Sequence, residues 1–145
     1  MSDAVRDSVV IKADADTIMD VIADFDAYPV WQPEMKQVEV LSTDEDGWAT
    51  QVRFHLDAKV VQSVYTLAYT YSDTSVAWRL VEGDSVRKID GSYTLVDRGD
   101  GTTEVTYDLE VDIAMKLPGL IKRQGAKRIV DGALKGLKQR VESQG

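Results

Sequence analysis

Apolar and polar residues alternate with a period of two over most of the chain. In the clearest run, residues 103–113, every second residue from Val105 to Ile113 is apolar and the residues between them are polar or charged. This period places alternate side chains on opposite faces of a strand, so that one face of the sheet is buried and the other is wet. The pattern predicts strands at residues 6–11, 35–42, 48–56, 60–71, 76–82, 86–97 and 103–113. Turn signals recur at short intervals between them, including Gly99-Asp100-Gly101, which indicates an antiparallel sheet.

Two segments follow the helical period instead. Asp14 stands at an N-cap position before apolar residues at 18, 21, 22 and 25, which predicts a short helix. Pro29 and Pro33 exclude both a continuing helix and a central strand after it. From Pro118 to about Val141 there is no internal proline, and the spacing predicts a long helix. Its apolar stripe consists of Ala126, Ile129, Val130, Ala133, Leu137 and Val141.

The order of these elements predicts one α+β domain over residues 1–145. We expect a seven-stranded curved antiparallel sheet around the long C-terminal helix, with one or two short helices after the first strand. Because a helix is only ~10–12 Å wide, it cannot cover the whole apolar face of such a sheet. The uncovered part must be a cavity, a mouth or a partner surface. Leu117, Leu120 and Ile121 lie off the helical stripe, so we expect them at the mouth, opposite the Tyr28–Trp31 turn.

Aromatic residues are concentrated on the predicted inner face of the strands. They are Tyr65, Tyr69, Tyr71, Trp78, Tyr93 and Tyr107. Any one of them is explained by ordinary packing, but a buried tyrosine hydroxyl needs a partner, and phenylalanine, which avoids that need, occurs only twice. As a set, they favour a pocket with apolar walls and a few polar groups. Thr50 and Ser63 are expected to share this lining, and Gly91 suits a bend or the close approach of a ligand.

These positions define the predicted binding site. We expect ligand contacts from Trp31, Phe54, Tyr65, Tyr69, Trp78, Tyr93, Tyr107, Leu120 and Ile121.

The composition narrows the possible chemistry. The chain has no cysteine, which excludes disulfides, thiolate catalysis and cysteine-ligated metals. The single histidine, His55, has outward parity, as do Arg53 and Arg79. There is no phosphate-binding loop, no dinucleotide signature and no clustered set of metal ligands. We therefore expect no metal and no cofactor, and we assign no catalytic residue.

The formal net charge of −8 opposes binding to nucleic acid. Residues 116–145 nevertheless carry eight basic and only two acidic side chains. This surface is either a solvated helix face or a peripheral contact site for an anionic lipid or an acidic partner. The N-terminal sequence lacks the basic start and apolar run of a signal peptide, and no stretch has the ~18 apolar residues of a transmembrane segment. We expect a cytoplasmic protein.

Five short motifs, in this order along the chain, carry a family resemblance. They are residues 13–16 (ADAD), 25–31 (FDAYPVW), 90–95 (DGSYTL), 117–120 (LPGL) and 133–142 (ALKGLKQRVE). Together they resemble the START-like (SRPBCC) superfamily, specifically its bacterial polyketide cyclase/dehydrase and lipid-transport branch, over essentially the whole chain. The resemblance implies a helix-grip fold, but this fold hosts carriers, sensors and enzymes alike.

Three functions are compatible with these observations. The favoured one is a carrier or sensor that binds a hydrophobic or aromatic small molecule (a lipid, a quinone or a polyketide-like ring) between sheet and C-terminal helix. The second is a polyketide cyclase/aromatase or dehydratase acting in the same cavity, for which Arg53, Arg79 and Arg87 are the nearby cationic candidates. The third is a protein-interaction domain that uses the basic C-terminal helix.

Overall fold

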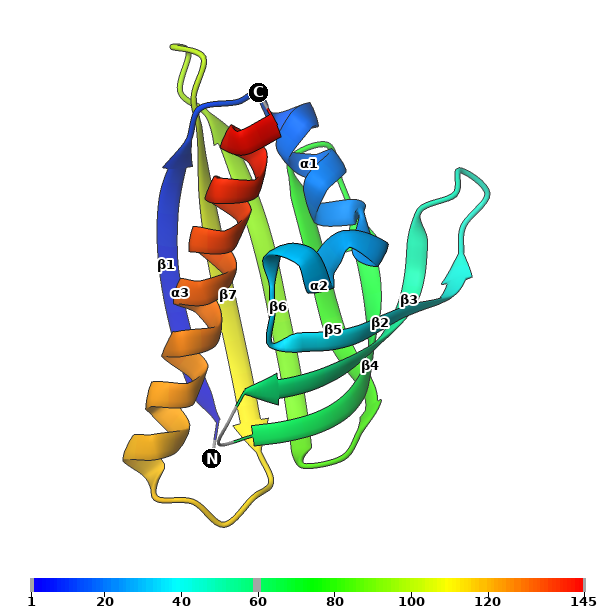
Figure 1. The fold of residues 1–145 in the computed structure, drawn as a ribbon, viewed down its shortest axis with the longest axis vertical. Helices are drawn as coiled ribbons and strands as arrows, with labels where there is room; N and C mark the ends of the chain where they lie inside the picture. Colours follow the sequence, from blue (N-terminus) through cyan, green and yellow to red (C-terminus); the bar gives the residue numbers. More distant parts are fainter. Residues whose placement is uncertain (1, 59–60, 145) are drawn as a thin grey trace.

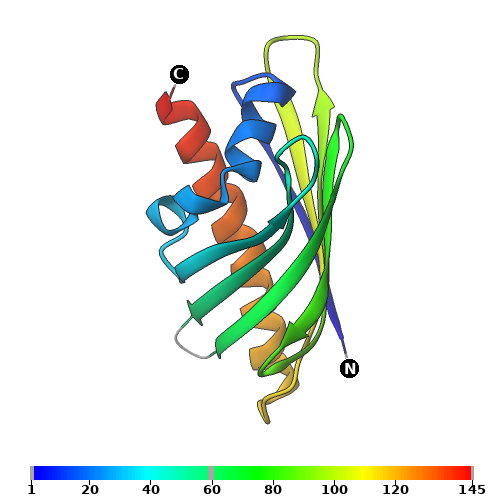
Figure 2. The same cartoon turned by 90° about the vertical axis from the view of Figure 1, so that its right-hand side faces the viewer.

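The computed structural model describes residues 2–58 and 61–144, which form one curved antiparallel sheet with a long helix on its concave side (Figures 1 and 2). The strands are β1 (Asp3–Ile11), β2 (Met35–Thr43), β3 (Ala49–Ala58), β4 (Val61–Tyr71), β5 (Ser75–Gly83), β6 (Val86–Asp97) and β7 (Thr103–Ile113). The helices are α1 (Ala15–Ala23), the 3₁₀ turn η1 (Phe25–Ala27), α2 (Tyr28–Trp31) and α3 (Gly119–Gln144). The helix-grip fold predicted from the sequence is confirmed. The predicted start of the fourth strand, at Val60, lies outside the described residues.

The strand order is β1-β7-β6-β5-β4-β3-β2, so β1 and β2 form the two edges of the sheet. The segment from α1 to α2 carries the chain from one edge to the other. Asp14 caps α1, as its sequence position predicts, by accepting a hydrogen bond from the Thr17 backbone N–H at 2.8 Å. After α1, the Tyr28 hydroxyl donates to the Ile22 carbonyl at 2.5 Å, which ties α2 back onto α1.

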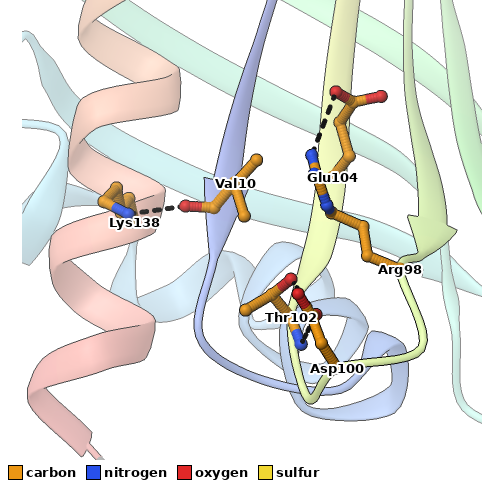
Figure 3. Close-up of polar contacts among 6 residues, drawn as sticks. All are labelled: Val10, Arg98, Asp100, Thr102, Glu104 and Lys138. Carbon is orange, nitrogen blue, oxygen red and sulfur yellow. Dashed lines mark hydrogen bonds and ion pairs between the residues drawn. The ribbon is translucent and has the colours of Figure 1, made fainter.

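The long helix α3 is fastened to the edge of the sheet and not to its centre (Figure 1). Lys138 Nζ donates to the Val10 carbonyl at 2.5 Å, and Glu142 accepts the Lys12 backbone N–H at 3.0 Å (Figure 3 shows the first of these). The buried residues of α3 are Ala126, Val130, Ala133, Leu134, Leu137 and Val141, so Leu134 is buried where the stripe predicted Ile129, which is half-buried. Because α3 stays at this edge, it leaves the inner faces of the central strands open.

The turn between β6 and β7 is the hairpin turn that the sequence predicts at Gly99-Asp100-Gly101. Gly99 and Gly101 adopt the left-handed φ values of 78° and 86°. Asp100 accepts hydrogen bonds from both the backbone N–H and the hydroxyl of Thr102 (Figure 3).

No helix in the described part of the chain has the length and apolarity to cross a bilayer.

Candidate ligand-binding cavity

A cavity of about 220 Å³ lies between the concave face of the sheet and the first half of α3. Its apolar walls include Phe54, Leu56, Leu67, Trp78, Ile89 and Leu109. An engineered cavity of about 150 Å³ in another protein admits benzene, so this one has room for more than a single ring. Left dry and empty, such a volume costs ~5 kcal/mol at ~24 cal/mol per Å³, which rivals the stability of a whole domain. The cavity is therefore filled with water or with a ligand.

Seven of the nine predicted contact residues line this cavity. They are Phe54, Tyr65, Tyr69, Trp78, Tyr93, Tyr107 and Ile121. Six of these are brought together by strand register, because Phe54 pairs with Tyr65, Tyr69 with Trp78 and Tyr93 with Tyr107 across neighbouring strands. The ring centroids within these pairs are 5.6, 5.8 and 4.8 Å apart. The period-two pattern had placed all six on the inner face, and the sheet curvature makes them converge.

Trp31 and Leu120 were predicted contacts, but neither lines the cavity. Trp31 packs instead on Gly136 of α3, where an added Cβ would lie 2.8 Å from the Trp31 carbonyl oxygen. Its indole Nε1 is buried and has no hydrogen-bond partner among the described residues. Leu120 is 68% exposed in the first turn of α3. Thr50 also lies elsewhere, since its hydroxyl hydrogen-bonds to that of Ser42 at 2.7 Å, whereas Ser63 does line the cavity.

The tyrosine hydroxyls in the cavity fall into two groups. Those of Tyr28 and Tyr65 have partners, the Ile22 carbonyl and the Met35 sulfur, the latter at 3.8 Å. Tyr69, Tyr93 and Tyr107 also line the cavity, and among the described residues no protein group hydrogen-bonds to their hydroxyls. Burial raises the pKa of each of these three phenols well above its ordinary value, so they remain neutral hydrogen-bond donors.

Gly91 is explained by the close approach of Trp78. The two residues pair across β5 and β6, and a Cβ on Gly91 would lie 2.4 Å from the indole ring. The sequence left open a bend or the approach of a ligand at this position. The structure shows that the indole itself occupies the space above Gly91, which lets Trp78 lie flat as part of the cavity wall.

The cavity has a polar rim that the sequence analysis did not identify. Its charged members are Glu34, Lys122 and Arg128, with Gln32 and Gln124 beside them. Arg128 Nε lies 3.4 Å from Glu34 Oε1, and Lys122 Nζ donates to the Ile113 carbonyl at 2.8 Å. The sequence did contain an indication that Arg128 belongs to this rim. Arg128 follows Ile121, a predicted ligand contact, by two helical turns and so lies on the same face of α3. On the other side, the rim comes from the segment after α2 and not from Val30 and Trp31.

The cationic side chains considered as candidates for an enzyme mechanism lie outside the cavity. Arg53, Arg79 and Arg87 do not line the cavity; Arg53 pairs with Glu39 at 3.3 Å on the outer face. His55 is half-buried and does not line it either, as its outward parity predicts. The described residues contain no group of three or more histidine, aspartate or glutamate side chains able to hold a metal ion.

Comparisons with known proteins agree with this architecture. The model of the family described as polyketide cyclase/dehydrase and lipid transport matches residues 2–142. A START superfamily protein from Mycobacterium smegmatis is 28% identical, with a TM-score of 0.89, covering 98% of this chain and 99% of that one. The Zhui aromatase/cyclase from Streptomyces sp. R1128 is 19% identical, with a TM-score of 0.81 and coverages of 99% and 96%.

A STAR-related lipid transfer protein from Xanthomonas axonopodis is 22% identical, with a TM-score of 0.72 and coverages of 96% and 85%. No curated protein matches the chain. The family description indicates hydrophobic ligand binding or polyketide cyclase activity, and the similar structures indicate a START fold. With a family match over nearly its whole length and the helix-grip architecture, the chain belongs to the polyketide cyclase/dehydrase and lipid transport family of START-like proteins.

Proposed function

We propose that the protein is a carrier or sensor that binds an aromatic molecule with oxygen substituents on its rings, such as a quinone or a polyketide-like ring system. The observation that carries this proposal is that Tyr69, Tyr93 and Tyr107 line an apolar cavity and that their hydroxyls have no hydrogen-bond partner among the described residues. Hydroxyl groups that face a cavity hydrogen-bond to water or to a ligand that displaces it. Ring carbonyl or hydroxyl groups satisfy these donors, whereas a plain hydrocarbon chain leaves them unsatisfied.

The size of the cavity is compatible with useful affinity. An aromatic group that buries ~200–250 Å² of apolar surface gains ~5–6 kcal/mol at ~25 cal/mol per Å². One or two hydrogen bonds to the tyrosines add ~1 kcal/mol each. Together these contributions correspond to a dissociation constant in the micromolar range.

A second candidate function is cyclisation or dehydration of a polyketide in the same cavity. It is supported by the same three hydroxyls, because a neutral phenol can donate a hydrogen bond to a carbonyl on which negative charge develops. The raised pKa values make these tyrosines poor bases at neutral pH. The inner walls of the described cavity contain no carboxylate or histidine to act as base, since Glu34 lies at the rim. The binding function is therefore favoured.

Titration of the intrinsic tryptophan fluorescence with naphthoquinone, polycyclic phenols and a fatty acid tests the proposal. We expect saturable quenching by the oxygenated rings with micromolar midpoints. Trp78→Phe removes most of the fluorescence response, because Trp78 lines the cavity whereas Trp31 and Trp48 do not. His55→Ala leaves the affinity unchanged, because His55 does not line the cavity.

If none of these ligands changes the fluorescence of the native protein, or if Trp78→Phe leaves the response intact, the binding proposal is wrong. Conversion of an added polyketone, detected as a product of changed mass or ring content, would instead assign the cyclase or dehydratase function.

A further inference from the structure

The charge of the cavity lining differs in sign from that of the whole protein. Among the described lining residues, the charged side chains are Glu34, Lys122 and Arg128, which leaves an excess of one positive charge. The chain as a whole has a net charge of −8. The Arg128 and Glu34 side chains are 60% and 35% exposed, so this charge lies at the rim and not among the aromatic walls.

The pairing between Arg128 and Glu34 is loose. The two charged atoms are 3.4 Å apart, whereas charge-assisted hydrogen bonds are ~2.7–2.9 Å long. Exposed ion pairs of this kind contribute little free energy, so a competing anion can replace Glu34 at small cost. The contact uses Nε, and the two terminal nitrogens of the guanidinium provide a planar fork that matches a carboxylate.

Lys122 is less suited to this role. One of its donors is committed to the Ile113 carbonyl at 2.8 Å. It precedes Arg128 by six residues, which is ~9 Å along a helix axis. Of the two cations, the arginine offers the better geometry for a carboxylate, because its planar fork donates two parallel hydrogen bonds.

We propose that the ligand is an aromatic carboxylate, with its oxygenated rings against the tyrosines and its acid group on Arg128. This inference rests on the proposed function and names the chemical class of its ligand. The ligand carboxylate replaces Glu34 as the anion beside Arg128, so the charge balance of the rim is retained. The displaced Glu34 carboxylate, already partly exposed, moves into water.

The test compares anthraquinone-2-carboxylate with its methyl ester, which has the same rings and no charge, by quenching of tryptophan fluorescence at neutral pH. For the native protein we expect the acid to bind about tenfold more tightly than the ester, which is the size of one charge-assisted hydrogen bond. Arg128→Gln abolishes this preference, because it weakens binding of the acid about tenfold more than binding of the ester. Glu34→Gln, which removes the competing carboxylate, increases the preference for the acid.

Lys127→Gln is the matched control. It removes the same charge from the neighbouring position, but Lys127 is exposed and does not line the cavity, so the preference for the acid is retained. Equal losses in Lys127→Gln and Arg128→Gln would show general charge attraction and overturn the assignment. Loss in Lys122→Gln with none in Arg128→Gln would overturn it as well. Equal binding of acid and ester by the native protein refutes the inference alone, whereas binding of neither refutes the proposed function itself.

Discussion

The tyrosines show how one residue type serves two purposes in the same cavity. The hydroxyl of Tyr28 has a backbone partner 2.5 Å away in a buried setting, and that contact joins α2 to α1. Tyr69, Tyr93 and Tyr107 line the cavity, and among the described residues their hydroxyls have no such partner. All four share apolar surroundings, so the difference lies in what each hydroxyl faces. The first contact contributes to folding, and the other three hydroxyls are available to a ligand.

This difference predicts opposite outcomes for two conservative substitutions. Tyr28→Phe leaves the buried Ile22 carbonyl without its partner and lowers the free energy of unfolding by about 1–3 kcal/mol. Tyr107→Phe removes a hydroxyl without a protein partner and changes it by less than about 0.5 kcal/mol. It nevertheless weakens binding of a quinone. Urea unfolding and fluorescence titration measure the two effects. Equal destabilisation by both substitutions would contradict the division of the tyrosines into two groups.

Gly91 makes a second prediction at the residue scale. Because an added Cβ would lie 2.4 Å from the Trp78 indole, Gly91→Ala must displace a large ring or bend β6. We expect a loss of about 1–3 kcal/mol in stability, as in other overpacked cores. We also expect a shift of the tryptophan emission, because the Trp78 indole is displaced from its position in the cavity wall. Unchanged stability and emission would show that the indole is free to move away.

At the scale of elements, the strands and the long helix were predictable because each keeps its period over many residues. β7 is buried and half-buried in strict alternation from Thr103 to Ile113. The strict alternation is interrupted at the start of β3, where Ala49 is buried and the preceding Trp48 is half-buried, with its ring against Tyr71. The pairing with β2 shifts there because Thr50 is an extra residue, and such a bulge reverses the parity of the residues before it.

The candidate site was predictable to the extent that it is built from strand parity. The aromatic walls follow from parity and register, and the sequence contains both. The rim depends on where the segment around Glu34 meets α3, which no local period specifies. Trp31 was assigned to the mouth for the same reason. The sequence does not show where its ring packs. The structure shows that Trp31 packs on α3 at Gly136, where the lack of a side chain allows close contact.

That packing makes two glycines of α3, one turn apart, respond oppositely to alanine. Gly132 has open space at its Cβ position, so Gly132→Ala adds helix propensity and stabilises by up to about 1 kcal/mol. Gly136→Ala places a methyl group 2.8 Å from the Trp31 carbonyl and 3.1 Å from its ring, and destabilises in spite of the same propensity gain. Thermal or urea unfolding of the two variants checks the signs. Stabilisation by both would show that α2 does not pack closely on α3.

For the whole molecule, the basic helix is partly balanced by the acidic remainder of the chain. Arg123 lies 3.9 Å from Asp3 and Arg128 pairs with Glu34, while Lys138 lies 3.1 Å from Glu142 of α3 itself. Lys122 and Lys138 also donate to strand carbonyls. The two carbonyl contacts help to hold the helix against the sheet, whereas the exposed ion pairs contribute little free energy. Two of the basic residues of the helix therefore have a structural role that needs no external partner.

The tyrosines also couple the stability of the whole molecule to alkaline pH. The pKa of each of the six is raised, with burial as the largest cause. The ordinary value is about 10, so above that pH the unfolded chain releases protons that the folded chain retains. Stability from this source is therefore complete below pH ~10 and declines as the pH rises further.

We accordingly expect no tyrosinate to form while the protein is folded. As the pH is raised above ~10, tyrosinate absorbance and loss of the far-ultraviolet circular dichroism should appear together in one cooperative transition. Tyr107→Phe should make the decline of stability with pH less steep, because one fewer proton is released on unfolding. Tyrosinate forming near pH 10 with the circular dichroism unchanged would mean that water and hydroxide reach the phenols in the native state. It would show that the cavity is more open to solvent than its aromatic walls indicate.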